Sequence, residues 1–161
     1  YYSEAYLHGA TLGSVKIEGE NSHYVADKIC ETIASLDVEW DQEPWKQLKT
    51  FRERLKAGNE ISKEIDSIHI SNSRDLHGSI KKHISNDHGV IIPSGWLGHA
   101  IVFIIMPGNL AKTYNLTVVN TGEGIEYHYH DKDPHGIYPL LSRIWVEFKN
   151  IPESEIFSPD A

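Results

Sequence analysis

Apolar positions change their spacing about halfway along the chain. In the first half they recur every three or four positions, as on one face of a helix. From Val90 onward they form short runs and alternating pairs, a pattern typical of strands. Helices first and antiparallel strands second predict an α+β domain, with a helical part over about 1–89 packed on a sheet part over about 90–150.

The first half has the start and stop signals of helices. Helices are predicted over about 23–36 and 44–56, and 73–84 is compatible with a short helix. Ser22 caps the first helix, and Pro44 suits the first turn of the second. We expect Gly58 to end the second helix. Near the N-terminus, the small residues around Gly9 predict a turn or the start of a helix.

The second half has short apolar runs separated by turn residues, as in antiparallel strands. Strands are predicted over about 90–92, 100–106, 114–119, 125–129 and 142–148. The run 100–106 is continuously apolar and rich in β-branched residues, which indicates a central strand. Pro107, Gly108 and Asn109 form a turn after it. The strands 100–106 and 114–119 are therefore expected to pair as a hairpin.

Length and charge narrow the class of protein. The 161 residues suit one domain, and 40% apolar residues are enough for one core. No apolar run is long enough to span a membrane, so we expect a soluble protein. A formal charge of −8 makes a poor match for nucleic acid or anionic lipid and fits a basic protein or peptide better, although it can also serve solubility alone. Because the chain begins with Tyr1, we expect it to be an excerpt or a processed piece.

The single cysteine, Cys30, excludes a disulfide within the chain and a zinc site built on cysteines. This favours a reducing compartment, as in the cytoplasm. Cys30 lies on the apolar stripe of the first predicted helix. We therefore interpret it as a small core residue.

His99 and Asn120 are the candidate chemical pair. His99 stands just before the strand 100–106, and Asn120 directly follows the strand 114–119. In an antiparallel hairpin the start of one strand lies beside the end of the next, so we expect the two side chains to be close together. A carboxamide beside an imidazole fixes its tautomer and orients it as a general base.

The segments His99-Ala100-Ile101 and Asn120-Thr121-x-Gly resemble the His and Asn blocks of papain-like cysteine peptidases, over about residues 95–124. The resemblance implies a papain-like fold that hydrolyses a peptide or isopeptide bond without a cofactor. His99 is then the base and Asn120 its orienting partner. Small acidic members of the superfamily include bacterial effectors that cleave ubiquitin or host proteins. The implied partner is a protein or peptide substrate, and the implied location is cytoplasmic, including that of a host cell.

The nucleophile of that family is a cysteine at the start of a helix, where the macrodipole and the imidazolium lower its pKa. The position here that fits best is Ala10, in His8-Gly9-Ala10-Thr11-Leu12, which precedes an expected helix start. We hypothesise that Ala10 replaces a catalytic cysteine, by engineering or by natural decay to a pseudoenzyme. The alternative is that Ala10 is an ordinary alanine in a domain that never was a peptidase.

Other parts of a papain-like site are less complete. The usual oxyanion-hole Gln is absent, so Glu4 or a backbone N–H has to serve. Gly9, Trp96 and Gly98 flank the two proposed catalytic positions and are assigned to substrate binding. Trp96 can shield the imidazole of His99 or line a groove, and ordinary packing is the alternative.

A second cluster predicts a different chemistry. In Tyr127-His128-Tyr129-His130, two histidines separated by one residue on a strand point to the same face, a common way to bind a metal. Together with His135 they resemble the first cupin motif, except that His135 replaces the usual Glu and Ser142 the expected later Gly. A metal site is therefore one alternative to a hydrolase, and a catalytically inactive protein-binding module of the same fold, with a groove around Trp96 and His99, is another. Histidines that are solvated or contact substrate are a further alternative.

Overall fold

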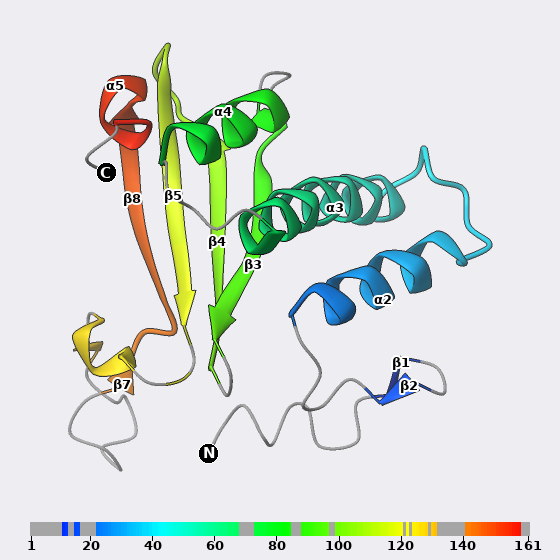
Figure 1. Ribbon diagram of the computed structural model, residues 1–161. Helices are drawn as coiled ribbons and strands as arrows, with labels where there is room; N and C mark the ends of the chain where they lie inside the picture. The colour runs from blue at the N-terminus through cyan, green and yellow to red at the C-terminus, as the bar shows by residue number, and fades with distance from the viewer. Residues whose placement is uncertain are drawn as a thin grey trace.

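The computed structural model describes residues 11–12, 15–16, 22–67, 73–84, 88–96, 99–120, 122, 124–128, 130–131 and 141–158. Its elements, in chain order, are β1 (Thr11–Leu12), β2 (Val15–Lys16), α2 (Ser22–Ala34), α3 (Trp45–Ser67), α4 (Ser73–Ile84), β3 (Val90–Trp96), β4 (His99–Pro107), β5 (Thr113–Asn120), the 3-10 helix η1 (Ile125–Tyr127), β6 (His130–Asp131), β7 (Leu141–Ser142), β8 (Trp145–Pro152) and α5 (Glu153–Ile156). The prediction of helices followed by an antiparallel sheet is confirmed (Figure 1).

The main sheet has four strands in the order β3-β4-β5-β8, and every neighbouring pair is antiparallel. The predicted central strand is β4, which pairs with β3 on one side and with β5 on the other. The hairpin between β3 and β4 brings Trp96 opposite His99, which is the last pair of their register. The sheet is therefore a simple meander up to β5, and β8 then adds its outer edge.

The core lies between one face of the sheet and the helices. Val90, Ile92 and Ile105 alternate toward this face, because residues two apart on a strand point to the same side. Ile61 from α3 and the α4 residues Ile80 and Ile84 complete the buried cluster. In Figure 1, α4 crosses this face, while α3 lies beside β3 and extends away from the sheet with α2 below it.

The prediction that Gly58 ends the second helix is wrong. The helix α3 continues through Gly58 to Ser67, and Gly58 is buried. A Cβ atom at this position would lie 2.0 Å from the carbonyl oxygen of Ile91 and 2.4 Å from the carbonyl carbon of the same residue. Gly58 therefore permits close approach of the helix to β3 and does not act as a stop.

α3 also covers the open edge of β3. The Ser62 hydroxyl donates a hydrogen bond of 2.6 Å to the carbonyl oxygen of Pro93. Because that carbonyl points away from β4, the missing N–H of Pro93 leaves no gap in the β3–β4 ladder. A buried serine thus satisfies an edge group that would otherwise be available to a foreign strand.

Two other segments differ from the predictions. Ile125–Tyr127 forms a 3-10 turn, where a strand over 125–129 was predicted. Gly124 precedes it with a φ of 88°, a left-handed conformation that interrupts an extended chain. The last strand of the sheet runs over Trp145–Pro152, later than the predicted 142–148, because the chain first forms the short strand β7.

Candidate functional site

His99 and Asn120 lie at the same end of the sheet. Asn120 pairs with Ile101 across β4 and β5, and His99 is two residues before Ile101 on β4. Side chains two residues apart on a strand, and those of directly paired residues, point to the same face. The imidazole and the carboxamide therefore share one face, which is also the face that carries the core.

Gly122 brings the two side chains into one compact arrangement. Its N–H donates a hydrogen bond of 2.9 Å to Oδ1 of Asn120, which is 6% exposed. A Cβ atom at Gly122 would lie 2.7 Å from Nδ1 of His99, 2.9 Å from Cε1 of His99 and 3.9 Å from Oδ1 of Asn120. The His99 ring therefore packs against the backbone of the loop that Asn120 begins.

The surroundings hold this end of the site in place. The backbone N–H of Asn120 donates to the carbonyl oxygen of Ile144 at 2.8 Å, which ties β5 to the start of β8. Nε2 of His99 is shielded from solvent. The Asn120 side chain, beside the His99 ring, is therefore held through both its backbone and its Oδ1.

The proposed nucleophile position gives a mixed result. Ala10, Gly9 and Gly98 lie outside the described residues. Of the turn or helix start predicted near Gly9, the helix start is wrong, because Thr11–Leu12 and Val15–Lys16 pair as antiparallel strands and the first described helix begins at Ser22. The β-branched residues Thr11 and Val15 favour such strands. No described helix therefore begins directly after position 10, as one does after the nucleophile of this family.

Cys30 does not replace the missing nucleophile. Its Sγ lies 3.7 Å from the carbonyl oxygen of Arg52, in the interface between α2 and α3. Burial raises the pKa of the Cys30 thiol above its ordinary value, and the nearby Arg52 guanidinium opposes this shift. A half-buried thiol with a raised pKa forms little thiolate near neutral pH, which fits a packing role.

Trp96 is placed by its backbone. It is the last residue of β3 and pairs directly with His99 in the register. The register places only the Trp96 backbone beside His99, so the assignment of its side chain to a substrate groove stays a prediction.

The alternative of a metal site assumed that His128 and His130 lie on one strand, which the structure does not show. His128 follows the 3-10 turn and is not on a strand, so the two-residue alternation assumed for His128 and His130 does not apply. The Nδ1–H group of His128 donates to the carbonyl oxygen of Arg143 at 2.9 Å. His135 lies outside the described residues, and among the side chains that are described no group of three metal-ligating residues occurs.

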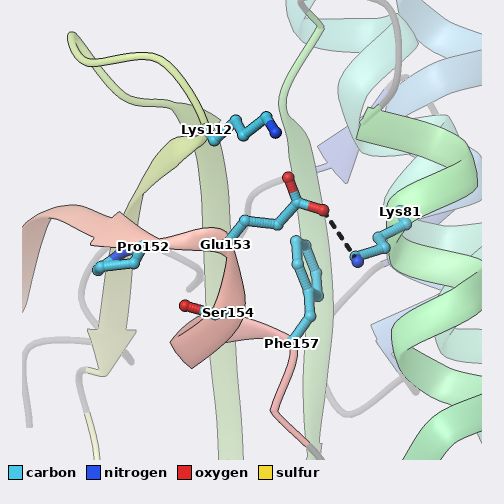
Figure 2. Close-up of a pocket in the computed structure, with 6 residues that line it drawn as sticks. All are labelled: Lys81, Lys112, Pro152, Glu153, Ser154 and Phe157. Atoms are coloured by element: carbon cyan, nitrogen blue, oxygen red, sulfur yellow. Dashed lines mark ion pairs between the residues drawn. The ribbon is translucent and has the colours of Figure 1, made fainter.

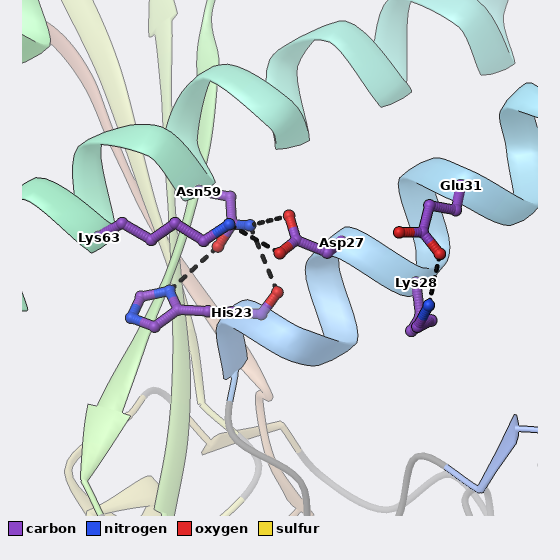
Figure 3. Close-up of polar contacts among 6 residues, drawn as sticks. All are labelled: His23, Asp27, Lys28, Glu31, Asn59 and Lys63. Atoms are coloured by element: carbon purple, nitrogen blue, oxygen red, sulfur yellow. Dashed lines mark hydrogen bonds and ion pairs between the residues drawn. The ribbon is translucent and has the colours of Figure 1, made fainter.

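A polar network between α2 and α3 was not predicted from the sequence (Figure 3). Asn59 is 2% exposed and accepts a 3.0 Å hydrogen bond from Nδ1 of His23 on its Oδ1. Its Nδ2 donates to Oδ1 of Asp27 at 2.8 Å and to the His23 carbonyl oxygen at 3.3 Å. Lys63 then pairs with Asp27 at 2.7 Å. Asn59 thus uses both amide hydrogens and its oxygen in bonds that join the two helices.

A cavity of about 450 Å³ lies at the other end of the sheet, beside α5 (Figure 2). Lys81 pairs with Glu153 at 2.9 Å, and its Nζ lies 5.0 Å from the centre of the Phe157 ring. The N–H of Glu153 donates to the carbonyl oxygen of Lys112 at 2.9 Å. The charged side chains of Lys81 and Glu153 are therefore paired with each other. Neither His99 nor Asn120 lines the cavity.

Comparison with known proteins gives no match: no protein-family model, no curated protein and no solved structure is significantly similar to the chain. The likeness to papain-like peptidases therefore depends on the residues around His99 and Asn120. In the described part of the chain, no helix is long and apolar enough to cross a membrane.

Proposed function

We propose that this domain carries the His–Asn half of a thiol hydrolase site for a peptide or isopeptide bond. One observation supports the proposal above the others. His99 and Asn120 share one face at the end of the β4–β5 hairpin, and both side chains contact the same short loop at Gly122. Such an arrangement suits an oriented general base.

In the proposed reaction a cysteine at position 10 is the nucleophile. His99 takes the proton of the thiol, and the thiolate attacks the carbonyl carbon to form a thioester as the amine leaves with that proton. Water then hydrolyses the thioester, and His99 again accepts and returns the proton. The Asn120 carbonyl oxygen has a second lone pair beyond its bond to Gly122, and this lone pair orients the imidazole.

The proposed substrate is a protein or peptide. The formal charge of −8 favours a basic segment of the substrate, because opposite charges steer association. The proposal that this substrate is ubiquitin or a host protein rests on the family resemblance alone. With alanine at position 10, the chain is expected to bind substrate without turnover.

The test installs the nucleophile and asks whether His99 activates it. The variant Ala10→Cys, in a Cys30→Ser background, is treated with a thiol-directed electrophile near neutral pH. We expect labelling that slows about a hundredfold when His99→Ala is added, within the usual range for a general base. His88→Ala removes an exposed histidine and should leave the rate unchanged. Labelling that does not depend on His99 would contradict the proposal.

A second candidate function is a binding module of the same fold without catalysis. It is favoured by Ala10 itself and by the strand that follows it, since neither suits an activated thiol. A parent gene with a codon other than Cys at position 10, together with slow labelling of Ala10→Cys, would support this candidate. A fast, His99-dependent reaction would exclude it.

A further inference from the structure

The outer edge of β8 has backbone groups available for pairing. Residues 145–148 are all register partners of β5, and the hydrogen bond from the Asn120 N–H to the carbonyl oxygen of Ile144 places the hydrogen-bonded pairs at the even-numbered residues Val146 and Phe148. In an antiparallel ladder the N–H and C=O groups of alternate residues point to opposite sides. Those of Trp145 and Glu147 therefore point away from β5, where no described strand meets them (Figure 1).

The same strand exposes apolar side chains on both faces. Phe148 is 50% exposed on the face that carries the core, because the helices cover β3, β4 and β5 better than β8. Trp145 is 44% exposed on the opposite face, and Ile144 is 51% exposed just before it. An open edge flanked by large apolar side chains is a template for another strand unless it is covered.

We propose that β8 pairs with β8 of a second copy of this chain, antiparallel, with the two-fold axis at Phe148. In this register Phe148 faces Phe148 of the other copy, and Glu147 lies opposite Lys149 of the other copy. Glu147 and Lys149 are on one face, where they form an ion pair of 3.2 Å within the chain. A strand with opposite charges at equal distances on either side of its centre is complementary to itself, which favours a two-fold partner.

The register can be tested by exchanging the charges. The full chain is examined by sedimentation velocity from micromolar to near-millimolar concentration, and we expect a reversible dimer. Glu147→Lys or Lys149→Glu places like charges opposite each other twice in the dimer and should weaken it about tenfold. The double variant restores both pairs and should recover the original affinity. Glu53→Lys makes the same charge change at an exposed site on α3 and should have no effect.

A backbone variant makes the test independent of charge. Glu147→Pro removes an N–H that points outward, so the β5–β8 ladder loses no hydrogen bond while the proposed interface loses two. Circular dichroism confirms that each variant is folded. A chain that stays monomeric over the whole range overturns the proposal. A dimer that responds neither to the single charge changes nor to the proline overturns it as well.

Discussion

At the scale of single residues, the site depends on a position that has no side chain. Gly122 is close to the His99 ring only because it lacks a Cβ atom. Its N–H also holds Oδ1 of Asn120, so one residue fixes both members of the proposed dyad. The geometry of the site thus includes a third residue whose contribution is to leave space.

Alanine at position 122 should displace the imidazole. A Cβ atom 2.7 Å from Nδ1 and 2.9 Å from Cε1 overlaps the ring, so His99 has to move. We expect Gly122→Ala to lower the free energy of unfolding by about 1–2 kcal/mol, as overpacking does. It should also shift the ring resonances of His99 in NMR spectra. Unchanged His99 resonances would show that the ring does not pack against this loop in solution.

The sequence predicted part of this residue-level picture. His99 and Asn120 could be paired because hairpin geometry follows from turn residues and alternation alone. Gly122 was visible only as part of an Asn-Thr-Gly string, with no indication of the ring beside it. Contacts between a loop backbone and a side chain of another strand depend on the loop conformation, which local sequence does not determine.

At the scale of elements, α3 shows that a glycine inside a helix can serve the packing of that helix. Gly58 and Gly78 are both helical, in α3 and α4, yet their surroundings are opposite. A Cβ at Gly58 meets the backbone of Ile91 and Ile92, while a Cβ at Gly78 meets nothing within 4 Å. Local propensity is the same for both residues, so sequence alone could not distinguish them.

The same substitution should therefore have opposite effects in the two helices. Gly58→Ala forces α3 away from β3 and should destabilise the fold by about 3 kcal/mol, at the upper end for overpacking. Gly78→Ala removes only backbone entropy from the unfolded chain and should stabilise the fold by up to about 1 kcal/mol. Urea denaturation of both variants measures the difference. Equal effects of the two substitutions would contradict the close contact of α3 with β3.

The α2–α3 interface provides a second prediction at this scale. Asn59→Ala removes the acceptor of the His23 Nδ1–H group and the amide donor of one Asp27 oxygen. We expect a loss of about 2 kcal/mol in the free energy of unfolding, the usual cost of such unsatisfied groups. Lys63→Ala removes only an ion pair whose side chains are about half exposed, so it should cost about 0.5 kcal/mol. A larger loss for Lys63→Ala than for Asn59→Ala would mean that charge, not the amide, joins the helices.

At the scale of the whole molecule, the sequence predicted the order of layers better than the ends of elements. The antiparallel core strands followed from continuous apolar runs and clear turns, and α2 from helical spacing, while the sequence over 73–84 was only compatible with the helix α4. The errors occurred where long-range contacts override local signals. Gly58 is inside a helix because β3 lies against it, and 125–129 is not a strand because the left-handed Gly124 interrupts it. Residue 10 lies outside the described residues, so its place beside His99 stays a prediction.

Near the C-terminus, one aromatic ring, that of Phe157, packs against several elements of the fold. Phe157 follows α5 and packs edge-on against Tyr114 of β5, with ring centres 5.3 Å apart, and against His77 of α4 at 6.2 Å. Lys81 of α4 lies over the same ring, and the ring packs against the buried core cluster. Three segments distant in sequence therefore meet at one side chain.

Phe157→Ala should loosen this junction while leaving the site at the other end of the sheet intact. Because the ring is only partly buried, we expect a loss of about 2 kcal/mol, below the usual cost of a fully buried phenylalanine. Phe157→Leu keeps most of the apolar volume but no ring, so it should recover about half of the loss. Hydrogen exchange should then show faster opening of α4 and α5 than of β4. If β4 opened equally fast, the C-terminal ring would stabilise the entire sheet, and α5 would be an integral part of the core.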